Sequence, residues 1–413
     1  TSVDTPAPDE GAPDITLPDI IEDIQSPDIP GEAVEIQTAR SEKSRDTSPS
    51  TTAIPSLTAG NRAFGFDLYH RMVAENPGTN IFLSPHSISI ALVMAYAGAL
   101  GDTADEMQGV LHFGPDDAVT HEAFNALDLI LAARGSEIVD EDTGDPFRLS
   151  IVNAAWGQVG YPFLPAYLDV LAENYGTGMF LLDFLTNAEA SRLTINDWVA
   201  WQSMDRIRDL LPQGSIDAST RLVLTNVIYF KANWLQKFLP EDTVDGPFTR
   251  TDQSMVTAKM MTKEDDLPYA DGDGYQLLAM PYVGNNVSMV LVLPDPGRFA
   301  EIEAAMTGPG FDAMWAAAMK GHGRITLPRF TFRFESALND ALQALGMTTA
   351  FDAGMADFSG MDGLPHNLFI SLVFHKNFVA IDELGTEAAA ATAVVMSETS
   401  VPTNVFDVTF NRP

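Results

Sequence analysis

The first half of the chain carries apolar side chains at the spacing of one face of an α-helix. Phe64, Leu68 and Met72 recur every four residues in the clearest of these runs. Another run follows Ser84-Pro85, and proline is tolerated in the first turn of a helix. The pattern predicts helices at 61–75, 84–100, 103–111, 119–134 and 187–206.

The second half is richer in patterns typical of β-strands. Residues 221–230 (RLVLTNVIYF) and 369–381 (FISLVFHKNFVAI) are nearly continuous apolar runs, as expected of strands buried on both faces. Residues 275–282 and 286–294 predict a hairpin that turns at Gly284-Asn285. Residues 323–334 alternate like a further strand. Helices come first, strands dominate later and no βαβ period is visible, so the pattern predicts a mixed α+β domain.

Residues 1–56 differ from the rest of the chain. They contain twelve acidic residues, three basic residues, eight prolines and no aromatic residue, and the triplet PDI occurs three times. Such a segment cannot bury enough apolar surface to offset the entropy lost on ordering. We predict that residues 1–56 form a disordered acidic, proline-rich tail, serving as a tether or as a short docking motif. Residues 57–413 are predicted to form one folded domain.

The charge of the chain limits its partners. The formal net charge is −34, so we expect nucleic acid and anionic membrane surfaces to be repelled. No run of eighteen apolar residues is free of charges and helix breakers, so no membrane-spanning segment is predicted. The chain contains no cysteine, which excludes disulfides, thiolate metal sites and cysteine nucleophiles.

Motifs of catalysis and of cofactor binding are missing from the sequence. The seven histidines lack the spacing of a helical zinc site, and there is no HExxH, GxSxG, P-loop or GxGxxG motif. The acidic stretches 140–145 (DEDTGD) and 271–274 (DGDG) lack the later glutamate of an EF-hand and are predicted to be solvated turns. No cofactor, metal or catalytic residue is predicted. A hydrolase on an unrelated mixed fold is an alternative without a supporting motif.

Residues 383–402 (ELGTEAAAATAVVMSETSVP) fit neither an ordinary helix nor an ordinary strand. The alanines favour a helix, but the segment has no apolar stripe for a helix to bury. Thr392, Val394 and Val395 favour a strand, but most of the other side chains are too small to hold a strand in place. A segment of twenty residues with mostly small side chains and no clear preference for helix or strand requires an explanation.

Several stretches, in consistent order, resemble the serpin family of serine-protease inhibitors. The resemblance covers roughly residues 59–413. It is strongest at 375–391 (HKNFVAIDELGTEAAAA), which is similar to the hinge of the family's reactive loop. The other stretches that carry it are 80–107 (NIFLSPHSISIALVMAYAGALGDTADEM), 198–217 (WVAWQSMDRIRDLLPQGSID), 220–238 (TRLVLTNVIYFKANWLQKF) and 338–361, with ALQALGM and ADFSGM.

The resemblance implies both a fold and a mechanism. The serpin fold has about nine helices and three β-sheets, and its central five-stranded sheet accepts the reactive loop as an extra strand. A serine protease attacks the loop and forms an acyl-enzyme. The cut loop then inserts into the sheet and traps the protease. The implied partner is a serine protease in a covalent complex, and the protein is expected to be a monomeric inhibitor rather than an enzyme.

In this sequence the resemblance assigns the reactive loop to residues 383–402. Alternate residues must enter the core when the loop becomes a strand. Thr386, Ala388, Ala390 and Thr392 would form that inward face, and all four are small and uncharged. Gly385 gives the backbone conformational freedom at the point where the loop must turn into the sheet. The hinge residues are Glu383, Gly385, Thr386, Glu387, Ala388, Ala389, Ala390 and Ala391.

The bond that the protease would cut follows from the family's usual spacing. Counting seventeen residues from Glu383 places the reactive bond between Thr399 and Ser400. Because threonine is small and β-branched, elastase-like or subtilisin-like proteases are expected to fit better than trypsin-like ones. Two other peptide bonds are alternative positions for the cut. Glu398-Thr399 would suit a glutamate-specific protease, and Met396-Ser397 would shorten the insertable strand by three residues.

Five further positions match structural clusters of the family. Ser84, Ser87, Asn226 and His375 match the shutter, a polar cluster under the opening of the main sheet. Trp234 matches the tryptophan of the breach, where insertion begins. Ordinary core packing is the alternative interpretation of this large aromatic side chain.

The two ends of the chain add further expectations. Residues 405–413 (VFDVTFNRP) resemble the strand that follows the reactive loop. Members of the family continue with two more apolar strands, so these last two strands are expected to be missing from this sequence.

The acidic tail suggests an extracellular or cell-surface tethered location. A non-inhibitory serpin that acts as a chaperone or carrier is the alternative function, although the small residues of the hinge favour inhibition.

Overall fold

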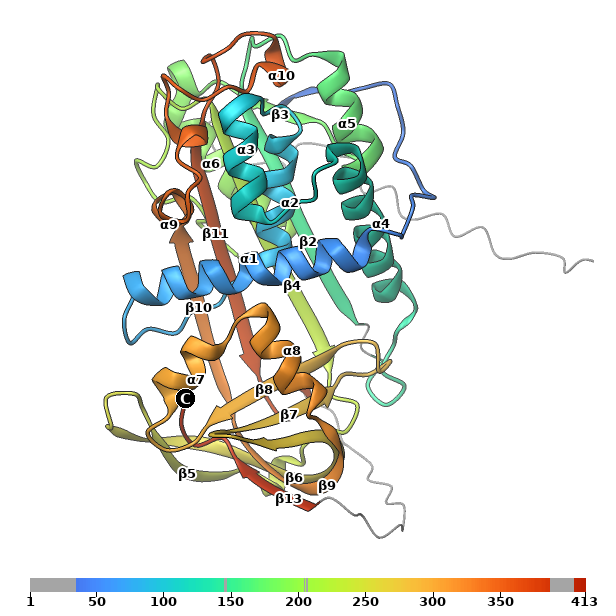
Figure 1. The fold of residues 1–413 in the computed structure, drawn as a ribbon, viewed down its shortest axis with the longest axis vertical. Helices are drawn as coiled ribbons and strands as arrows, with labels where there is room; N and C mark the ends of the chain where they lie inside the picture. Colours follow the sequence, from blue (N-terminus) through green and yellow to red (C-terminus); the bar gives the residue numbers. More distant parts are fainter. Residues whose placement is uncertain (1–34, 145–146, 204, 206, 387–404) are drawn as a thin grey trace, which may run out of the picture.

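The computed structural model describes residues 35–144, 147–203, 205, 207–386 and 405–413 (Figure 1). Within these residues the chain forms ten α-helices, two short 3-10 helices and thirteen β-strands. The helices are α1 (Ile54–Glu75), α2 (Pro85–Tyr96), α3 (Gly101–Leu111), α4 (Asp117–Glu137), α5 (Pro165–Tyr175), α6 (Phe184–Gln202), α7 (Phe299–Ala305), α8 (Gly308–Ala316), α9 (Asn339–Leu345) and α10 (Ser359–Asp362). The strands are β1 (Gln37–Ala39), β2 (Arg148–Gln158), β3 (Met179–Leu182), β4 (Leu222–Asn233), β5 (Val244–Thr249), β6 (Met255–Gly272), β7 (Tyr275–Pro281), β8 (Ser288–Pro294), β9 (Met319–Pro328), β10 (Phe330–Ala337), β11 (Ile370–Ile381), β12 (Gly385–Thr386) and β13 (Val405–Thr409).

The predicted α+β class and most of the predicted elements are confirmed. The five predicted helices correspond to α1–α4 and α6, and the two continuous apolar runs form β4 and β11. The hairpin is β7–β8, and its turn residues Gly284 and Asn285 have φ angles of 86° and 53°. Glycine and asparagine are the residues that adopt positive φ most readily, so both suit this turn.

The main sheet has seven strands in the order β1-β3-β2-β4-β12-β11-β10 (Figure 1). Five of them, β3, β2, β4, β11 and β10, make up the five-stranded sheet that was expected, and β1 and β12 are additions of three and two residues. β4 and β11 run parallel and pair from Leu222↔Ile370 to Val227↔Lys376. Toward their other ends the two strands diverge, and β12 lies between them.

The second sheet has the order β13-β9-β6-β7-β8, with β5 also paired to β6. Strand β6 is eighteen residues long and pairs in turn with β5, β9 and β7. Where three sheets were expected, the described residues therefore form two, because this one continuous strand joins the smaller ones. The single strand predicted at 323–334 is wrong. The run breaks at Arg329, so that β9 lies in the second sheet and β10 in the main sheet.

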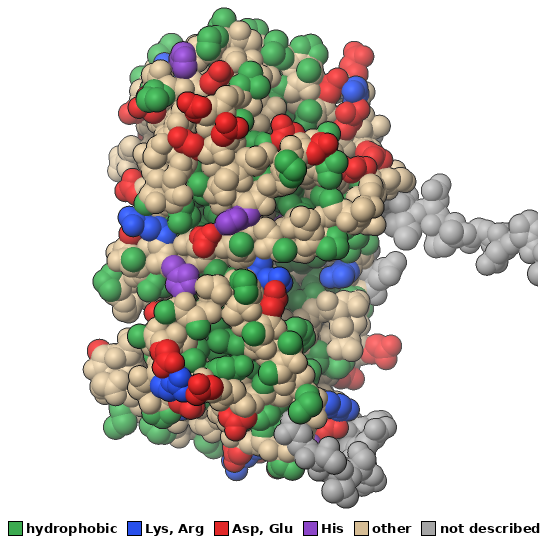
Figure 2. All heavy atoms as spheres, in the orientation of Figure 1, with side chains coloured by type: hydrophobic (Ala, Val, Ile, Leu, Met, Phe, Trp, Pro, Cys, Tyr) green, Lys and Arg blue, Asp and Glu red, His purple; other side chains and the backbone are tan. Residues whose placement is uncertain are grey.

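The acidic surplus lies on the surface. Figure 2 shows Asp and Glu side chains spread over the helical half of the molecule, with only a few Lys and Arg side chains among them. Among the described residues, no helix is both long enough and apolar enough to cross a membrane.

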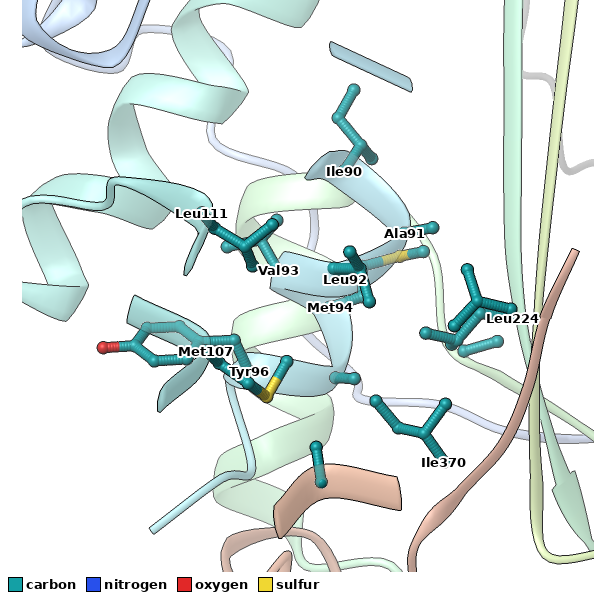
Figure 3. Packing of buried hydrophobic residues seen from close by; sticks show 14 of the residues in the cluster. Ile90, Ala91, Leu92, Val93, Met94, Tyr96, Met107, Leu111, Leu224 and Ile370 are labelled. Atoms are coloured by element: carbon teal, nitrogen blue, oxygen red, sulfur yellow. The ribbon is translucent and has the colours of Figure 1, made fainter. Parts of the chain in front are cut away.

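Helix α2 packs against the part of the main sheet where β4 and β11 are paired. Residues 87–96 of this helix are all buried, as expected of a helix that is covered on every side. Figure 3 shows α2 between Met107 and Leu111 of α3 and, on the sheet side, Leu224 of β4 and Ile370 of β11. Helix α2 therefore supports the closed part of the main sheet.

Residues 35–50, here called the strap, correct the prediction of a tail that is disordered up to residue 56. Strand β1 pairs antiparallel with β3 and so extends the edge of the main sheet. After β1, the hydroxyl of Ser41 donates to the carboxylate of Asp169 on α5, and α1 already begins at Ile54. The composition argument considered only apolar burial, whereas the strap is also held by hydrogen bonds and ion pairs. Residues 1–34 lie outside the described residues.

Two basic side chains of the strap meet acidic partners on the helices. Nε of Arg45 donates to Oδ1 of Asn125 at 2.8 Å, and its Nη2 lies 2.6 Å from Oδ2 of Asp128, both on α4. Nζ of Lys43 lies 2.9 Å from Glu173 of α5, in a more exposed pair. In a strongly acidic chain, these few basic groups bind the strap to α4 and α5.

We expect Arg45→Ala to lower the free energy of unfolding by about 1–3 kcal/mol, because two hydrogen bonds are lost at a partly buried site and one of them is to a carboxylate. Lys43→Ala is the matched control, since exposed ion pairs are worth at most about 1 kcal/mol. Urea unfolding followed by circular dichroism measures both effects. An equal loss of unfolding free energy in the two variants would contradict the conclusion that Arg45 binds the strap more strongly than Lys43 does.

Candidate functional site

Strand β12 lies between the diverging ends of β4 and β11. Gly385 is opposite Asn233 of β4. Thr386 is opposite Ala232 of β4 and Ile381 of β11. A Cβ atom on Gly385 would lie 2.1 Å from the carbonyl oxygen of Ala232, so glycine is required for this close approach of the two backbones.

The side chain of Thr386 points into the protein. It is 4% exposed, and its hydroxyl lies 2.8 Å from the phenolic oxygen of Tyr282. Burial raises the pKa of Tyr282 above its ordinary value, so the phenol stays protonated. The Tyr282 ring stacks on Trp234 with 4.6 Å between ring centroids. The indole Nε1 of Trp234 donates to the carbonyl of Asp382, so this tryptophan is a core residue that also holds the segment before β12.

Residues 233–238, here called the receiving turn, hold the start of the hinge through their backbone. The N–H of Trp234 donates to the carbonyl of Leu384 at 2.8 Å, and the N–H of Phe238 donates to the carbonyl of Glu383 at 2.9 Å. Together with the pairing of Gly385 to β4, these bonds fix three successive residues before the rest of the loop.

The side chain of Glu383 is fixed as well. Its Oε1 accepts a hydrogen bond from the hydroxyl of Thr243 at 2.9 Å, and its Oε2 lies 3.6 Å from Nη1 of Arg329. The residue is 9% exposed. Glu383, the predicted first residue of the hinge, is therefore an anchored residue rather than part of a free loop.

A closed seam lies beyond the open end of the main sheet. Six residue pairs join β4 to β11, from Leu222↔Ile370 to Val227↔Lys376. Between this seam and β12, residues 228–231 of β4 and 377–380 of β11 are not paired with each other in the described part of the sheet. Among the described residues, β4 and β11 are therefore separated directly ahead of β12, in a stretch here called the slot, and are paired in the seam beyond it.

The structure brings Ser84, Ser87, Asn226 and His375 together at the end of the seam. Nδ1 of His375 lies 2.7 Å from Oδ1 of Asn226, its neighbour across the two strands. Nε2 of His375 accepts from the backbone N–H of Ser84 at 3.2 Å. Nδ2 of Asn226 donates to the hydroxyl of Ser87. All four residues are buried, so the network joins the start of α2 to both strands of the seam.

These partners fix the charge state of His375. The amide oxygen of Asn226 only accepts, so Nδ1 of the imidazole must donate to it. Nε2 must accept, since it faces the N–H of Ser84 and the amide nitrogen of Asn377 at 2.6 Å. Burial lowers the pKa of His375 to about 3, and the carbonyl of Phe82 opposes this shift only in part. The cluster is therefore neutral at pH 7.

Several members of the site were not predicted from the sequence, among them Asn153 and Tyr282. Oδ1 of Asn153, on β2, accepts from Nδ2 of Asn226 at 2.5 Å. An asparagine inside the apolar run of β2 was the available signal, because a buried amide needs partners. No local signal marks Tyr282, whose partner Thr386 lies 104 residues further along the chain.

The remaining predicted site residues lie outside the described residues. The structure places the first part of the hinge, Glu383, Gly385 and Thr386. The positions that it does not describe are Glu387, Ala388, Ala389, Ala390 and Ala391 of the hinge, the predicted reactive bond Thr399-Ser400, and the alternatives at Glu398 and Met396.

The sequence is similar to a large protein family. A family model described as Serpin (serine protease inhibitor) matches residues 59–413. The leukocyte elastase inhibitor of Bos taurus is 37% identical over 352 residues, which cover 82% of this chain and 89% of that protein. An uncharacterized serpin-like protein of Thermococcus kodakarensis is 38% identical over 336 residues, which cover 81% of this chain and 75% of that protein.

Solved structures show the same fold. The thermophilic serpin tengpin, in its native state, matches with a TM-score of 0.76 and 26% identity, over 92% of this chain and 94% of that chain. Uncleaved ovalbumin matches with a TM-score of 0.73 and 28% identity, over 81% of this chain and 89% of that chain. The fold expected from the sequence is therefore confirmed.

Proposed function

Because the chain belongs to the serpin family, we propose that it is an irreversible inhibitor of serine proteases, which traps the enzyme by inserting its cut reactive loop into the main sheet. The observation that carries the proposal is the position of β12, which already lies between β4 and β11 with the side chain of Thr386 buried. The similarity to leukocyte elastase inhibitors, at 37% identity for the bovine protein, supports protease inhibition as the activity.

The register of β12 predicts the path of the rest of the loop. If the strand continues in register, Ala390 comes to lie between Ile228 of β4 and Asn377 of β11, which fills the open slot. Ala391 then reaches Val227 and Lys376, which are paired with each other before insertion. Residues 387–390 therefore enter without breaking a pair between β4 and β11, whereas each later residue must open the seam.

The same register bears on the choice of reactive bond. Continued to the far end of the seam, it places Met396 opposite Leu222, the last paired residue of β4. A cut after Thr399 leaves three residues between the inserted strand and the protease, and a cut after Glu398 leaves two. A cut after Met396 leaves none. The register therefore favours Thr399-Ser400 or Glu398-Thr399 over Met396-Ser397.

The proposed reaction begins as ordinary proteolysis. The serine hydroxyl of the protease attacks the carbonyl carbon of Thr399, and the bond from this carbon to the nitrogen of Ser400 breaks. The amine of Ser400 leaves with a proton from the protease's histidine, while Thr399 stays bound to the enzyme as an ester. Insertion of the loop before water cleaves this ester distorts and traps the enzyme. The small threonine favours elastase-like or subtilisin-like targets.

Loop insertion has a sufficient driving force. About ten residues would join the centre of the sheet, and ladder hydrogen bonds contribute roughly 0.5–1.5 kcal/mol each, which gives on the order of 10 kcal/mol. Pairs broken in the seam are replaced by pairs to the new strand on both sides. The uncut protein is therefore proposed to be metastable, held by the kinetic barrier of opening the seam.

Incubation with an elastase-type and a subtilisin-type protease tests this function. We expect a covalent complex that survives SDS, a single cut in the loop located by mass spectrometry, and a rise in the melting temperature of the cleaved protein. A trypsin-type protease is the comparison enzyme and should form less complex. Cleavage without complex and without a rise in melting temperature would instead favour a non-inhibitory serpin that acts as a chaperone or carrier.

We further propose that the inhibitor acts as a monomer, because the hinge, the slot and the seam all belong to one chain. An extracellular or cell-surface tethered location stays a prediction that rests on the acidic tail.

A further inference from the structure

The loop between α4 and β2 places the carboxylate of Asp140 against both ends of the receiving turn. Nδ2 of Asn233 donates to Oδ2 of Asp140 at 2.6 Å. Nζ of Lys237 lies 2.9 Å from Oδ2 and 3.1 Å from Oδ1 of the same carboxylate. The side chains of Asp140 and Lys237 are each 5% exposed. The expectation of a solvated turn at 140–145 is therefore wrong for Asp140.

Asp140 is also fixed by its own loop. Its Oδ1 accepts from the backbone N–H of Asp142 at 2.9 Å, and its carbonyl accepts from the N–H of Gly144 at 2.8 Å. Burial acts to raise the pKa of Asp140, but the hydrogen bonds from Asn233 and Lys237 outweigh burial and hold the pKa below its ordinary value. The carboxylate is therefore charged at neutral pH and rigidly placed.

The receiving turn thus has two opposite attachments. Its side chains at positions 233 and 237 bind Asp140, while its backbone holds the hinge through Phe238 to Glu383 and through Asn233 to Gly385. A buried ion pair is seldom the most stabilising choice, because two charges must be desolvated. Such a pair does fix the relative position of its two side chains. Here it fixes the position of the receiving turn, to which the hinge is hydrogen-bonded.

We propose that Asp140 is a positioning residue for loop insertion, which clamps the receiving turn so that the hinge starts its new strand in register. The proposal rests on the proposed function. In a trapping inhibitor, insertion competes with hydrolysis of the ester that joins loop and protease. Without the clamp, the receiving turn no longer holds residues 383–385 in place, so insertion slows and more of the loop is cut without trapping the enzyme.

The stoichiometry of inhibition tests this positioning role. For Asp140→Asn we expect about threefold more inhibitor to be consumed per protease molecule trapped, with an unchanged rate of loop cleavage. Asp142→Asn is the matched control, because this 57% exposed carboxylate also lies 3.0 Å from Nζ of Lys237 but belongs to the loop's outer side. The control should keep the wild-type stoichiometry. Equal stoichiometry in wild type and Asp140→Asn would overturn the proposal.

Hydrogen exchange provides a second readout that needs no protease. In the uncut protein, the amides of Trp234 and Phe238 donate to the hinge, so we expect both to exchange about tenfold faster in Asp140→Asn and at the wild-type rate in Asp142→Asn. Lys237→Gln should give the same increase, and it serves if Asp140→Asn does not fold. Unchanged exchange would overturn the clamp. A wild-type protein that traps no protease would overturn the proposed function while this measurement still decides the clamp.

Discussion

Thr386→Arg is expected to convert the inhibitor into a substrate. Thr386 is 4% exposed, lies between Ala232 and Ile381 on the two flanking strands, and bonds to Tyr282. A guanidinium at this position would have to be buried without a charged partner, at a cost of several kcal/mol. Insertion would stall at its first inward residue while the rest of the loop remains open to cleavage. Gel analysis with an elastase-type protease should show at least about a tenfold loss of SDS-resistant complex, with cleavage continuing.

Two variants separate this effect from a general effect of charge or of substitution. Thr386→Ser keeps the hydroxyl that bonds to Tyr282 and should keep most of the complex. Val405→Arg adds the same charge just after the reactive loop, at a side chain that is 73% exposed, and should leave the complex yield unchanged. A normal yield of complex from Thr386→Arg would show that the loop does not insert through this residue.

The elements with strong local patterns were predictable from the sequence. The apolar runs of β4 and β11 and the helical spacing of α1 each reflect burial within one segment. The run at 323–334 misled because apolar and polar residues alternate on both sides of Arg329. The alternation shifts by one residue at Pro328-Arg329, where the chain passes from one sheet to the other. Strand β1 has only three residues and no apolar pattern, so its pairing with β3 could not be predicted from its own sequence.

The site was predictable only in part, because its contacts join distant segments. The positions of Ser84, Asn226 and His375 followed from the resemblance, whereas the direction of each hydrogen bond required the structure. Asp140 was misjudged for a related reason. Its own neighbours are acidic and turn-forming, and its partner Lys237 lies 97 residues further along the chain. Nothing local to either residue shows that the two charges are buried together.

The neutral state of His375 gives the seam a pH dependence with a defined sign. The pKa of this side chain is about 3 in the folded protein and about 6.5 in an unfolded chain. Between these values the unfolded chain binds the proton and the folded protein does not, so stability is complete above pH 6.5 and is lost as the pH falls toward 3. At pH 5 the loss from this group is about 2 kcal/mol, at 1.36 kcal/mol for each pH unit below 6.5.

Acidification should therefore destabilise the protein at the seam in particular. A protonated Nε2 would face two donors, the N–H of Ser84 and the amide of Asn377, and the carbonyl of Phe82 offsets the cost of burying the charge only in part. Urea unfolding from pH 7 to pH 5 should show about 2 kcal/mol less loss in His375→Gln than in wild type. Other groups, including the buried His121 with its pKa of about 4, contribute equally to both proteins and cancel in the difference. Equal pH dependence in the two proteins would mean that His375 is not held neutral by the fold, and the seam would then need another explanation for its closure.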